Sequence, residues 1–332
     1  MKHSNISIFI PHMGCPHLCS FCNQHSISGS DAAPSISQVK LILDNALKTL
    51  GERVSEAQIA FFGGSFTAIP RKYMEQLLNA AQPYIGECGF NGIRISTRPD
   101  CIDEEILSLL KKNNVVAIEL GIQSMDDDVL LLNDRGHDSS DVINAAELIK
   151  SYGFELGAQM MVGLYADNEQ TIRHTASEIV RLEFDTVRIY PVAVLKGTKL
   201  AELYNKGEFV PPTIDSAIDI CADLIMYFTN ENIDIIRVGL HASEVVEQDF
   251  IAGIYHPAFR ELCENKIYYR LIKHEIGGKV GEFTVHVASR EISKAIGQNK
   301  SNVRKFMQQN INLKIKPNDS LEKYQVVILK EV

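Results

Sequence analysis

The stretch Gly14-Cys15-Pro16-His17-Leu18-Cys19-Ser20-Phe21-Cys22 decides how the whole chain is interpreted. Its three cysteines, Cys15, Cys19 and Cys22, have the spacing CxxxCxxC and come directly after a predicted strand, Ile6–Ile10. Three thiolates this close in sequence cannot serve three different sites, so we expect a loop that wraps around one metal centre. Soft thiolate ligands select an iron–sulfur cluster or zinc.

Two kinds of metal centre fit this loop. A structural zinc ion needs a fourth ligand, and His12, His17 and His25 are nearby candidates, but structural zinc motifs usually come as two separated pairs of ligands. A 4Fe–4S cluster held by only three cysteines keeps one iron free. The amino and carboxylate groups of S-adenosylmethionine (SAM) can chelate such an iron. We favour the cluster over zinc because motifs further along the chain agree with it.

Strand and helix patterns alternate along the first two thirds of the chain. Between about residues 6 and 236, short β-branched runs alternate with longer amphipathic stretches, which implies an α/β fold of parallel strands joined by helical crossovers. The pattern suits a doubly wound sheet or an incomplete barrel. The predicted strands are Ile6–Ile10, Gln58–Phe62, Ile93–Thr97, Val115–Leu120, Glu155–Val162 and Thr186–Val192, and the predicted helices are Ile36–Leu50, Tyr73–Ile85, Asp103–Lys111, Asp138–Tyr152, Asn168–Leu182 and Ile214–Asn230.

The composition is that of a globular protein. Apolar residues make up 45% of the 332 residues, but no apolar run approaches the ~20 residues that a membrane helix needs. The amino terminus has no signal-peptide cleavage pattern, so we expect a cytoplasmic protein without a membrane partner. The cysteines do not form a disulfide framework, and the four outside the loop are expected to be buried or neutral thiols: Cys88, Cys101, Cys221 and Cys263.

With Phe21 before its last cysteine, the loop resembles the CxxxCxφC motif of the radical SAM superfamily, where φ is aromatic. The resemblance implies a partial (β/α)6 barrel and reductive cleavage of SAM to a 5′-deoxyadenosyl radical that abstracts hydrogen from a substrate. It also implies that Cys15, Cys19 and Cys22 ligate a 4Fe–4S cluster, that Phe21 lies near the adenine, and that an external flavodoxin or ferredoxin supplies the electron. The radical chemistry belongs to the cofactor, which the protein orients and shields from water.

Residues at the ends of predicted strands match SAM-contacting positions of this family. Gly63-Gly64-Ser65 matches the glycine-rich motif that holds the methionyl amino group, and glycines allow a close approach of the backbone. Glu119 and Gln123 close the fourth strand, where a ribose diol would satisfy them, and Gln123 matches a glutamine of oxygen-independent coproporphyrinogen III oxidase. Gln159 is expected either to face SAM or to be a core residue whose side chain is hydrogen-bonded to the backbone. Arg135 is expected to form a charge-assisted pair with the SAM carboxylate. The alternative is that Arg135 lies on the protein surface.

As a set, the motifs over about residues 6–210 are similar to the radical SAM half of the Elongator catalytic subunit, a tRNA wobble-uridine-modifying enzyme. The cysteine spacing departs from that pattern, because the Elongator enzyme has a longer gap between its first two cysteines. We also expect no acetyltransferase domain, and so a shorter, Elongator-like relative. The resemblance is carried by Ser96–Asp100, Glu119–Ser124, Asn133–His137, Met160–Leu164, Arg188–Pro191 and Lys196–Thr198.

A small α+β module is expected at residues 283–332, after a barrel at 1–236 and a connecting region at 237–282. Within it, Ile292–Phe306 resembles the helix–GxxG–helix of KH RNA-binding domains, with Lys300 in place of the second glycine. Residues 290–332 carry nine basic and four acidic residues in a chain of net charge −9, which suits a polyanionic partner. We expect either a structural appendage that covers the barrel or RNA contact through Gln298, Lys300, Arg304 and Lys305. The predicted elements are strands Phe283–Val287, Leu313–Lys316 and Gln325–Leu329 and helices Arg290–Ile296 and Asn302–Gln308.

The sequence therefore predicts a radical SAM enzyme that modifies a substrate, with RNA or tRNA as the preferred class. Arg188, Tyr190 and Lys196, near the sixth strand, are expected to face that substrate. Two alternatives stay open. One is a small-molecule (porphyrinogen-type) radical SAM oxidase, and the other is a non-catalytic nucleic-acid-binding protein with a structural zinc or iron–sulfur site.

Overall fold

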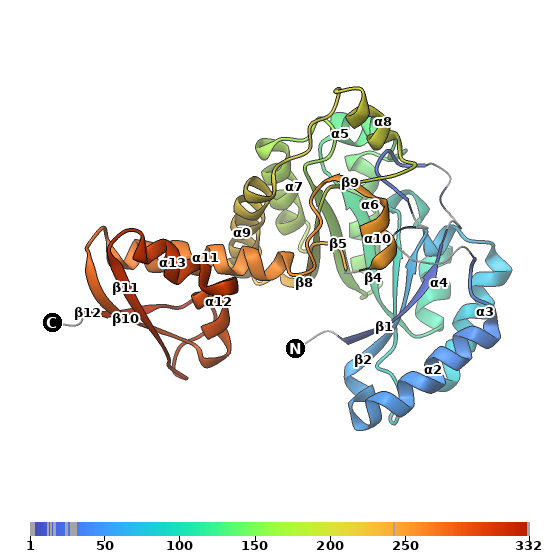
Figure 1. Ribbon diagram of the computed structural model, residues 1–332. Coiled ribbons are helices and arrows are strands. Elements are labelled where there is room, and N and C mark those ends of the chain that lie inside the picture. The colour runs from blue at the N-terminus through green and yellow to red at the C-terminus, as the bar shows by residue number, and fades with distance from the viewer. Residues whose placement is uncertain are drawn as a thin grey trace. The chain divides into compact units, whose positions relative to one another are not determined.

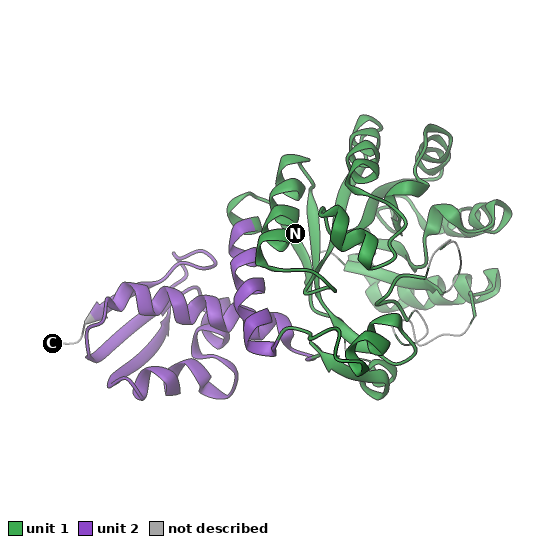
Figure 2. Ribbon diagram, turned by 90° about the horizontal axis from the view of Figure 1, so that it is seen from above, with its two compact units in different colours: residues 1–212, 228–255 green, residues 213–227, 256–332 purple. Residues whose placement is uncertain are grey.

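The computed structural model describes residues 4–11, 13, 15, 18–23, 26, 32–241 and 243–330 (Figure 1). They form two compact units, one within residues 1–212 and 228–255 and the other within residues 213–227 and 256–332 (Figure 2). None of the helices in this part of the chain combines the length and the apolar character that a membrane crossing requires.

The first unit is built on a curled sheet of seven parallel strands (Figure 1). The strands lie side by side in chain order, and helices connect most of them, so the predicted partial barrel of the radical SAM type is confirmed. All six predicted strands are present, and β8 adds a seventh. The strands are β1 (Ser4–Ile10), β2 (Ala57–Gly63), β3 (Ile93–Thr97), β4 (Val115–Gln123), β5 (Glu155–Val162), β6 (Thr186–Pro191) and β8 (Asp234–Val238).

Amphipathic helices connect the strands of this sheet. In the first of them, α2, the buried residues Val39, Leu43 and Ala46 recur every three or four positions and form one apolar face. Ser35 and Asn168 begin α2 and α7 as capping boxes, in which side chain and backbone satisfy each other's hydrogen bonds. The helices of the first unit include α2 (Ile36–Leu50), α3 (Arg71–Ala81), α4 (Glu104–Lys112), α5 (Asp127–Leu132), α6 (Ser139–Ser151), α7 (Glu169–Arg181), α8 (Lys199–Asn205) and α10 (Glu244–Asp249).

The two outer strands of the curled sheet are β1 and β8. Phe9 of β1 and His241, shortly after β8, stack with ring centroids 6.2 Å apart and an interplanar angle of 28°. Two short strands outside this sheet, β7 (Ala193–Leu195) and β9 (Phe250–Gly253), pair antiparallel to each other. The sequence did not predict β7, β8 or β9.

The second unit contains a three-stranded sheet with the order β11-β10-β12. Its central strand β10 (Gly281–Val287) is parallel to β11 (Ile311–Pro317) and antiparallel to β12 (Val327–Lys330). Two short helices, α12 (Ile292–Ile296) and α13 (Ser301–Met307), lie between β10 and β11 in the chain, so the predicted order of strands and helices is confirmed. The unit also contains α11 (Phe259–Ile276) and residues 214–227 of α9 (Ile214–Asn230).

The turn between α12 and α13 holds three residues with left-handed backbone. Gly297 has φ +80°, and a Cβ there would lie 2.9 Å from the backbone nitrogen of Asn302, so the position favours glycine. Asn299 and Lys300 also have positive φ, 52° and 60°. Asparagine tolerates this region well, whereas lysine does so at a cost of about 1–2 kcal/mol. Lys300 therefore occupies the kind of backbone position that favours glycine.

Candidate active site

All three cysteines of the motif line one cavity of about 370 Å³ at the carboxyl ends of the strands. The loop after β1 supplies the thiols, and the ends of β2, β3 and β4 supply much of the remaining wall. Most of the residues predicted to contact SAM lie in this wall. They are Phe21, Gly63, Gly64, Ser65, Gln123, Arg135 and Gln159, and the other lining residues are Cys15, Leu18, Cys19, Cys22, Ser96, Thr97, Arg98 and Gly121.

Glycine is required at the end of β2 because the cysteine loop passes directly over it. A Cβ at Gly64 would lie 2.0 Å from the carbonyl oxygen of Met13, and the Gly64 N–H donates to the carbonyl of Ile10 at 2.9 Å. At Gly63 the backbone has φ +115°, and a Cβ would lie 2.8 Å from the Ile10 oxygen. The two glycines thus position the start of the cysteine loop, in addition to any contact with a ligand.

Two buried arginines face the cysteine cavity. Arg135 Nη1 lies 3.0 Å from the sulfur of Cys19, its other terminal nitrogen donates to the Gly121 carbonyl, and its guanidinium lies 5.9 Å from the ring centre of Phe21. Arg98 is held by Asp100 through two bonds of 2.8 Å each. Within the described residues, Arg98 Nη1 and Arg135 Nε are buried without a hydrogen-bond partner. Buried donors of this kind need an acceptor, and a bound anion would supply it.

This donor set fits the implied cofactors. Three thiols and two guanidinium groups surround one cavity, which suits a thiolate-bound cluster and the carboxylate of SAM. In the described part of the chain, no three His, Cys, Asp or Glu side chains are grouped in a way that could hold a single metal ion. The zinc-ligand candidates His12, His17 and His25 lie outside the described residues.

The backbone is irregular where β4 enters the site. The pairing of β4 with β5 shifts register between Leu120 and Gln123, and Gln123 itself has φ +64°. A non-glycine residue in this region costs of order 1–2 kcal/mol, and such strain is concentrated at functional sites. The irregularity ends the strand with the Gln123 side chain in the cavity wall.

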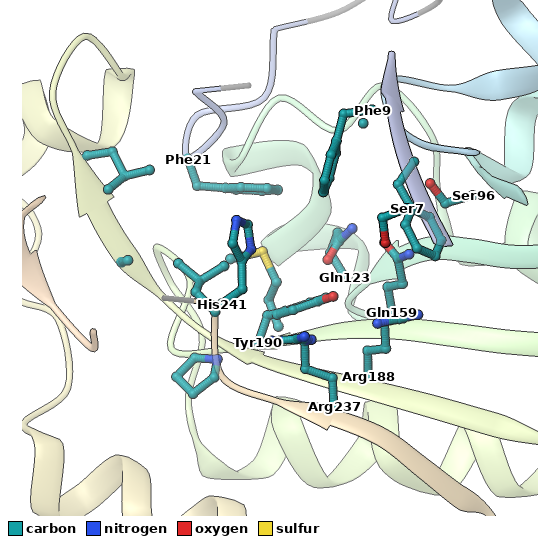
Figure 3. A pocket seen from close by; sticks show the side chains of 17 residues that line it. Ser7, Phe9, Phe21, Ser96, Gln123, Gln159, Arg188, Tyr190, Arg237 and His241 are labelled. Carbon is teal, nitrogen blue, oxygen red and sulfur yellow. The ribbon is translucent and has the colours of Figure 1, made fainter. Parts of the chain in front are cut away.

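Figure 3 shows a second cavity, of about 410 Å³. It shares part of its wall with the first cavity. The shared residues are Phe21, Gly63, Ser96, Gln123 and Gln159. The second cavity alone is lined by Ser7, Phe9, Phe62, Met161, Arg188, Tyr190, Pro191, Ala193, Leu195, Arg237, Leu240 and His241. Arg188 and Tyr190 were predicted to face a substrate, and both are in this list.

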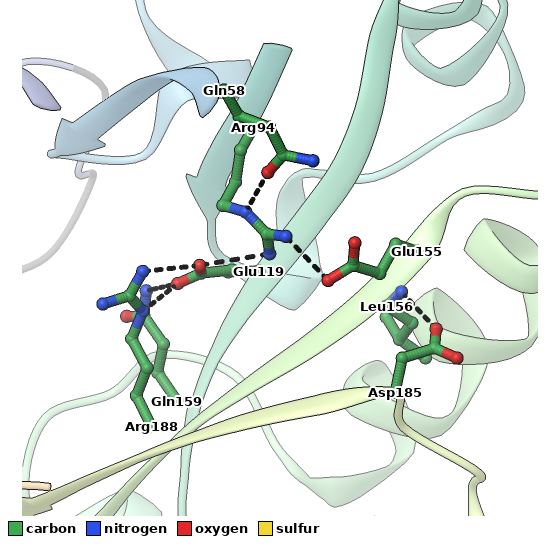
Figure 4. A network of polar contacts seen from close by, with 8 residues as sticks. All are labelled: Gln58, Arg94, Glu119, Glu155, Leu156, Gln159, Asp185 and Arg188. Atoms are coloured by element: carbon green, nitrogen blue, oxygen red, sulfur yellow. Dashed lines mark hydrogen bonds and ion pairs between the residues drawn. The ribbon is translucent and has the colours of Figure 1, made fainter. Parts of the chain in front are cut away.

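Glu119 lies at the centre of a buried ion-pair network (Figure 4). Its carboxylate accepts two bonds from Arg188, at 2.6 and 2.9 Å, one from Gln159 at 2.9 Å and one from Arg94 at 3.3 Å. Arg94 reaches on to Glu155 at 2.7 Å. Burial alone would raise the pKa of Glu119, but Arg188 and Arg94 outweigh it and hold the pKa below its usual range. The network fixes the positions of Gln159 and Arg188, which line the second cavity.

The remaining predicted site residues do not line either cavity. Glu119 is not among the lining residues of either, and its contact with SAM stays a prediction. Lys196 is exposed and donates to the Gln248 carbonyl at 2.5 Å. In the second unit, Lys300, Arg304 and Lys305 are exposed and Gln298 is half-buried. Among the other cysteines, Cys221 and Cys263 are buried and Cys88 is exposed.

Sequence reasoning missed several residues of the two cavities. Arg98 lies in a polar cluster directly after the third predicted strand, and Ser96 lies near the end of that strand, so these positions were the available signal. Arg237 and His241 come from β8 and the segment after it, which was not predicted as part of the sheet. Phe62 has its ring 5.0 Å from the Arg188 guanidinium, a contact between strands that the sequence does not reveal.

His137 is a buried neighbour of the two cavity-facing arginines. Burial, together with the positive charges of Arg135 and Arg98, lowers its pKa to about 3, although Asp100 acts in the opposite direction. The ring is therefore neutral at physiological pH and adds no third positive charge beside the cysteine cavity.

A curled parallel sheet with three cysteines, a glycine pair and two arginines around one cavity defines a radical SAM type of protein. Comparison with known families agrees: the model of the radical SAM superfamily matches residues 9–179, and that of the radical SAM C-terminal domain matches residues 184–269. The chain belongs to the radical SAM superfamily and is a radical SAM enzyme. A 4Fe–4S cluster and SAM are the cofactors of this superfamily.

Several known proteins are similar to this chain. An uncharacterised protein of Methanocaldococcus jannaschii is 30% identical over 232 residues, covering 69% of this chain and 68% of that protein. The tRNA uridine(34) acetyltransferase of Methanocaldococcus infernus and Elongator complex protein 3 of Saccharomyces cerevisiae are each 27% identical over 52% and 54% of this chain. The chain matches only 36% of the length of each of these two proteins.

Solved structures agree on the fold. The archaeal Elp3 of Methanocaldococcus infernus, lacking its N-terminus, superimposes with a TM-score of 0.64 at 20% identity, over 81% of this chain and 63% of that chain. Coproporphyrinogen III oxidase from Escherichia coli gives a TM-score of 0.51 at 19% identity, over 69% and 53% of the two chains. At this level of identity the likeness concerns the fold alone.

Proposed function

We propose that this chain binds a 4Fe–4S cluster through Cys15, Cys19 and Cys22, binds SAM beside it, and modifies an RNA substrate that enters the second cavity. The observation that carries the proposal is the wall shared by the two cavities, because it lets a cofactor in one cavity act on a substrate in the other. When bound, the cluster and SAM supply one-electron cleavage and a hydrogen-abstracting radical.

The protein's own residues bind and orient the cofactor. Arg135 and Arg98 line the cysteine cavity, where their positive charges can attract an anion, and Asp100 holds the Arg98 guanidinium in place. Phe21 offers an aromatic face on the side shared by both cavities. The Gln123 and Gln159 amides lie in the same shared wall, where they can bond to polar groups of SAM. Phe9, Phe62 and Met161 make the second cavity largely apolar and exclude water from the reacting groups.

The proposal that the substrate is RNA is supported by the exposed cations of the second unit and by the similar proteins. The turn before α13 exposes Lys300, and α13 exposes Arg304 and Lys305, so three cations are available for phosphate contacts. Two of the relatives are a tRNA uridine(34) acetyltransferase and an Elongator protein. We propose further that the substrate is tRNA and that the enzyme is cytoplasmic. A flavodoxin or ferredoxin would supply the electron.

RNA binding is tested with the full chain and a matched control. The variant K300A/R304A/K305A removes three cations from the turn and α13, and K40A/K48A/R53A removes three exposed cations from α2 and the turn after it. We expect tRNA binding in a gel shift to weaken at least about tenfold in the first variant, because it loses the proposed phosphate contacts. Binding should weaken little in the second variant, which has the same loss of charge but keeps those contacts. Equal weakening in both variants would indicate a general charge effect and contradict the proposal.

The substrate class is tested by comparing modified nucleosides from an anaerobically grown deletion strain and its parent. We expect one nucleoside to disappear from tRNA or rRNA in the deletion strain and to return when the intact gene is restored. An unchanged nucleoside profile, from a protein that still forms 5′-deoxyadenosine, would favour the second candidate, a small-molecule radical SAM oxidase. That candidate is supported by the second cavity, whose volume of about 410 Å³ suits a small ligand.

A further inference from the structure

We infer that the second cavity contains an oxyanion subsite at Arg237, so that the substrate carries a phosphate or carboxylate group there. The inference rests on the proposed function, because it assigns a feature to the substrate of the same site. Arg237 lies on β8 and lines the cavity together with Tyr190 of β6 (Figure 3).

The first support is the pairing of two arginines on neighbouring strands. In the register of β6 and β8, Arg188 lies opposite Arg237, and both side chains line the same cavity. Like charges in such a position repel each other, so each needs a compensating negative charge. Glu119 supplies it for Arg188 through bonds of 2.6 and 2.9 Å.

The second support is that no carboxylate is left for Arg237. Both oxygens of Glu119 are occupied by Arg188, Arg94 and Gln159, and Glu155 pairs with Arg94. Among the residues that the structure describes, no acidic side chain lies within ion-pair distance of Arg237, and neither Asp nor Glu lines the cavity. A half-buried guanidinium in a largely apolar cavity is therefore uncompensated, and an anionic ligand would supply the missing charge.

The surroundings of Arg237 define the chemistry of the ligand. Burial raises the pKa of Tyr190, although Arg188 and Arg237 oppose the shift, so its hydroxyl keeps the proton and can donate a hydrogen bond to an oxyanion. The guanidinium of Arg188 is bonded by Glu119 at its edge and covered by Phe62 at 5.0 Å. Phe9 and Phe62 favour an apolar or aromatic body attached to the anionic group.

Isothermal titration calorimetry of the reconstituted, SAM-bound protein tests the subsite with three probes of similar shape. Benzoate and phenyl phosphate carry the two kinds of oxyanion, and benzamide is the neutral control. We expect the parent protein to bind at least one of the anions at least about tenfold more tightly than benzamide, as charge-assisted hydrogen bonds do. The anion that binds more tightly identifies the group that the substrate carries.

The variant R237Q should lose that tenfold preference while benzamide binds as before, which shows that the cavity is intact. R237K should recover part of the preference, and R53Q, which removes an exposed arginine outside the cavity, should leave all three affinities unchanged. The inference is overturned if the parent protein binds the anions no better than benzamide, or if R237Q retains the preference. The proposed function is tested by a separate measurement. It would fail if the parent protein formed no 5′-deoxyadenosine.

Discussion

The guanidinium of Arg188 and the carboxylate of Glu119 form a two-point ion pair, with Nε 2.6 Å from Oε2 and Nη2 2.9 Å from Oε1. Both side chains are almost fully buried, at 8% and 1% exposure. A buried pair of this geometry links β4 to β6 under the second cavity. Removing one partner leaves the other as a buried charge without compensation.

We therefore expect Glu119→Gln to lower the free energy of unfolding by about 3–5 kcal/mol, because the buried Arg188 loses its carboxylate and Arg94 is left with Glu155 alone. Urea denaturation measures the loss. The control is Glu105→Gln, which breaks an exposed pair with Arg71 and should cost less than about 1 kcal/mol. Equal losses in the two variants would contradict the central position of Glu119.

His137 should make the protein less stable as the pH falls. Its pKa is about 3 in the folded chain and 6.5 in the unfolded chain, so below pH 6.5 only the unfolded chain binds the proton. The stability contributed by the neutral ring is complete above pH 6.5 and falls by about 2 kcal/mol by pH 5. In His137→Gln this part of the pH dependence should disappear, as measured by denaturation between pH 5 and pH 8. His174→Gln, at an exposed position, is the control and should behave like the parent protein.

Arg98 should contribute directly to SAM binding. Lysine in its place keeps the charge but loses both the two-point contact with Asp100 and the buried Nη1 donor. We expect Arg98→Lys to raise the Kd for SAM at least about tenfold in equilibrium dialysis, with the iron content unchanged. The same change at Arg173, which pairs with Glu169 on the surface, should leave the Kd as it is. An unaltered Kd for SAM in Arg98→Lys would contradict a role of Arg98 in SAM binding.

Gly64 should be essential for the cysteine loop itself. Its Cβ would collide with the Met13 carbonyl at 2.0 Å, so Gly64→Ala must displace the loop just before Cys15. We expect the reconstituted variant to hold less than about half of the parent's iron, because cluster binding needs all three thiolates together. Gly207→Ala is a stringent control, since Gly207 has φ +75° but open space around it. A full iron content in Gly64→Ala would be inconsistent with this role.

Much of the first unit could be predicted from its sequence because local patterns determine it. The β-branched runs became β1 to β6, and Ile36–Leu50 is a helix with the predicted bounds. The three cysteines could be assigned to one site because their spacing leaves no other arrangement. Gly63, Gly64 and Gln123 could be found because parallel strands bring their carboxyl ends to one edge of the sheet.

Other features depend on contacts between distant strands, which no local pattern encodes. The position of Glu119 in the sequence suggested a contact with a ligand. In the structure its carboxylate is bonded instead by Arg188, Arg94 and Gln159, which come from the separate strands β6, β3 and β5. β8 is only five residues long and contains Asp234 and Arg237, so its alternation was too short to indicate a strand. Arg237 consequently escaped attention, although it lines the second cavity.

The cluster is tested most directly by the iron content and SAM cleavage of Cys19→Ala beside Cys88→Ala, both reconstituted anaerobically and reduced with dithionite. Cys19 lies in the cavity, 3.0 Å from Arg135, whereas Cys88 is exposed and lines neither cavity. We expect the parent protein and Cys88→Ala to hold about four irons per chain and to form 5′-deoxyadenosine, and Cys19→Ala to do neither. A Cys19→Ala protein that still cleaves SAM, or a parent protein that contains zinc and no iron, would contradict the assignment of the three cysteines.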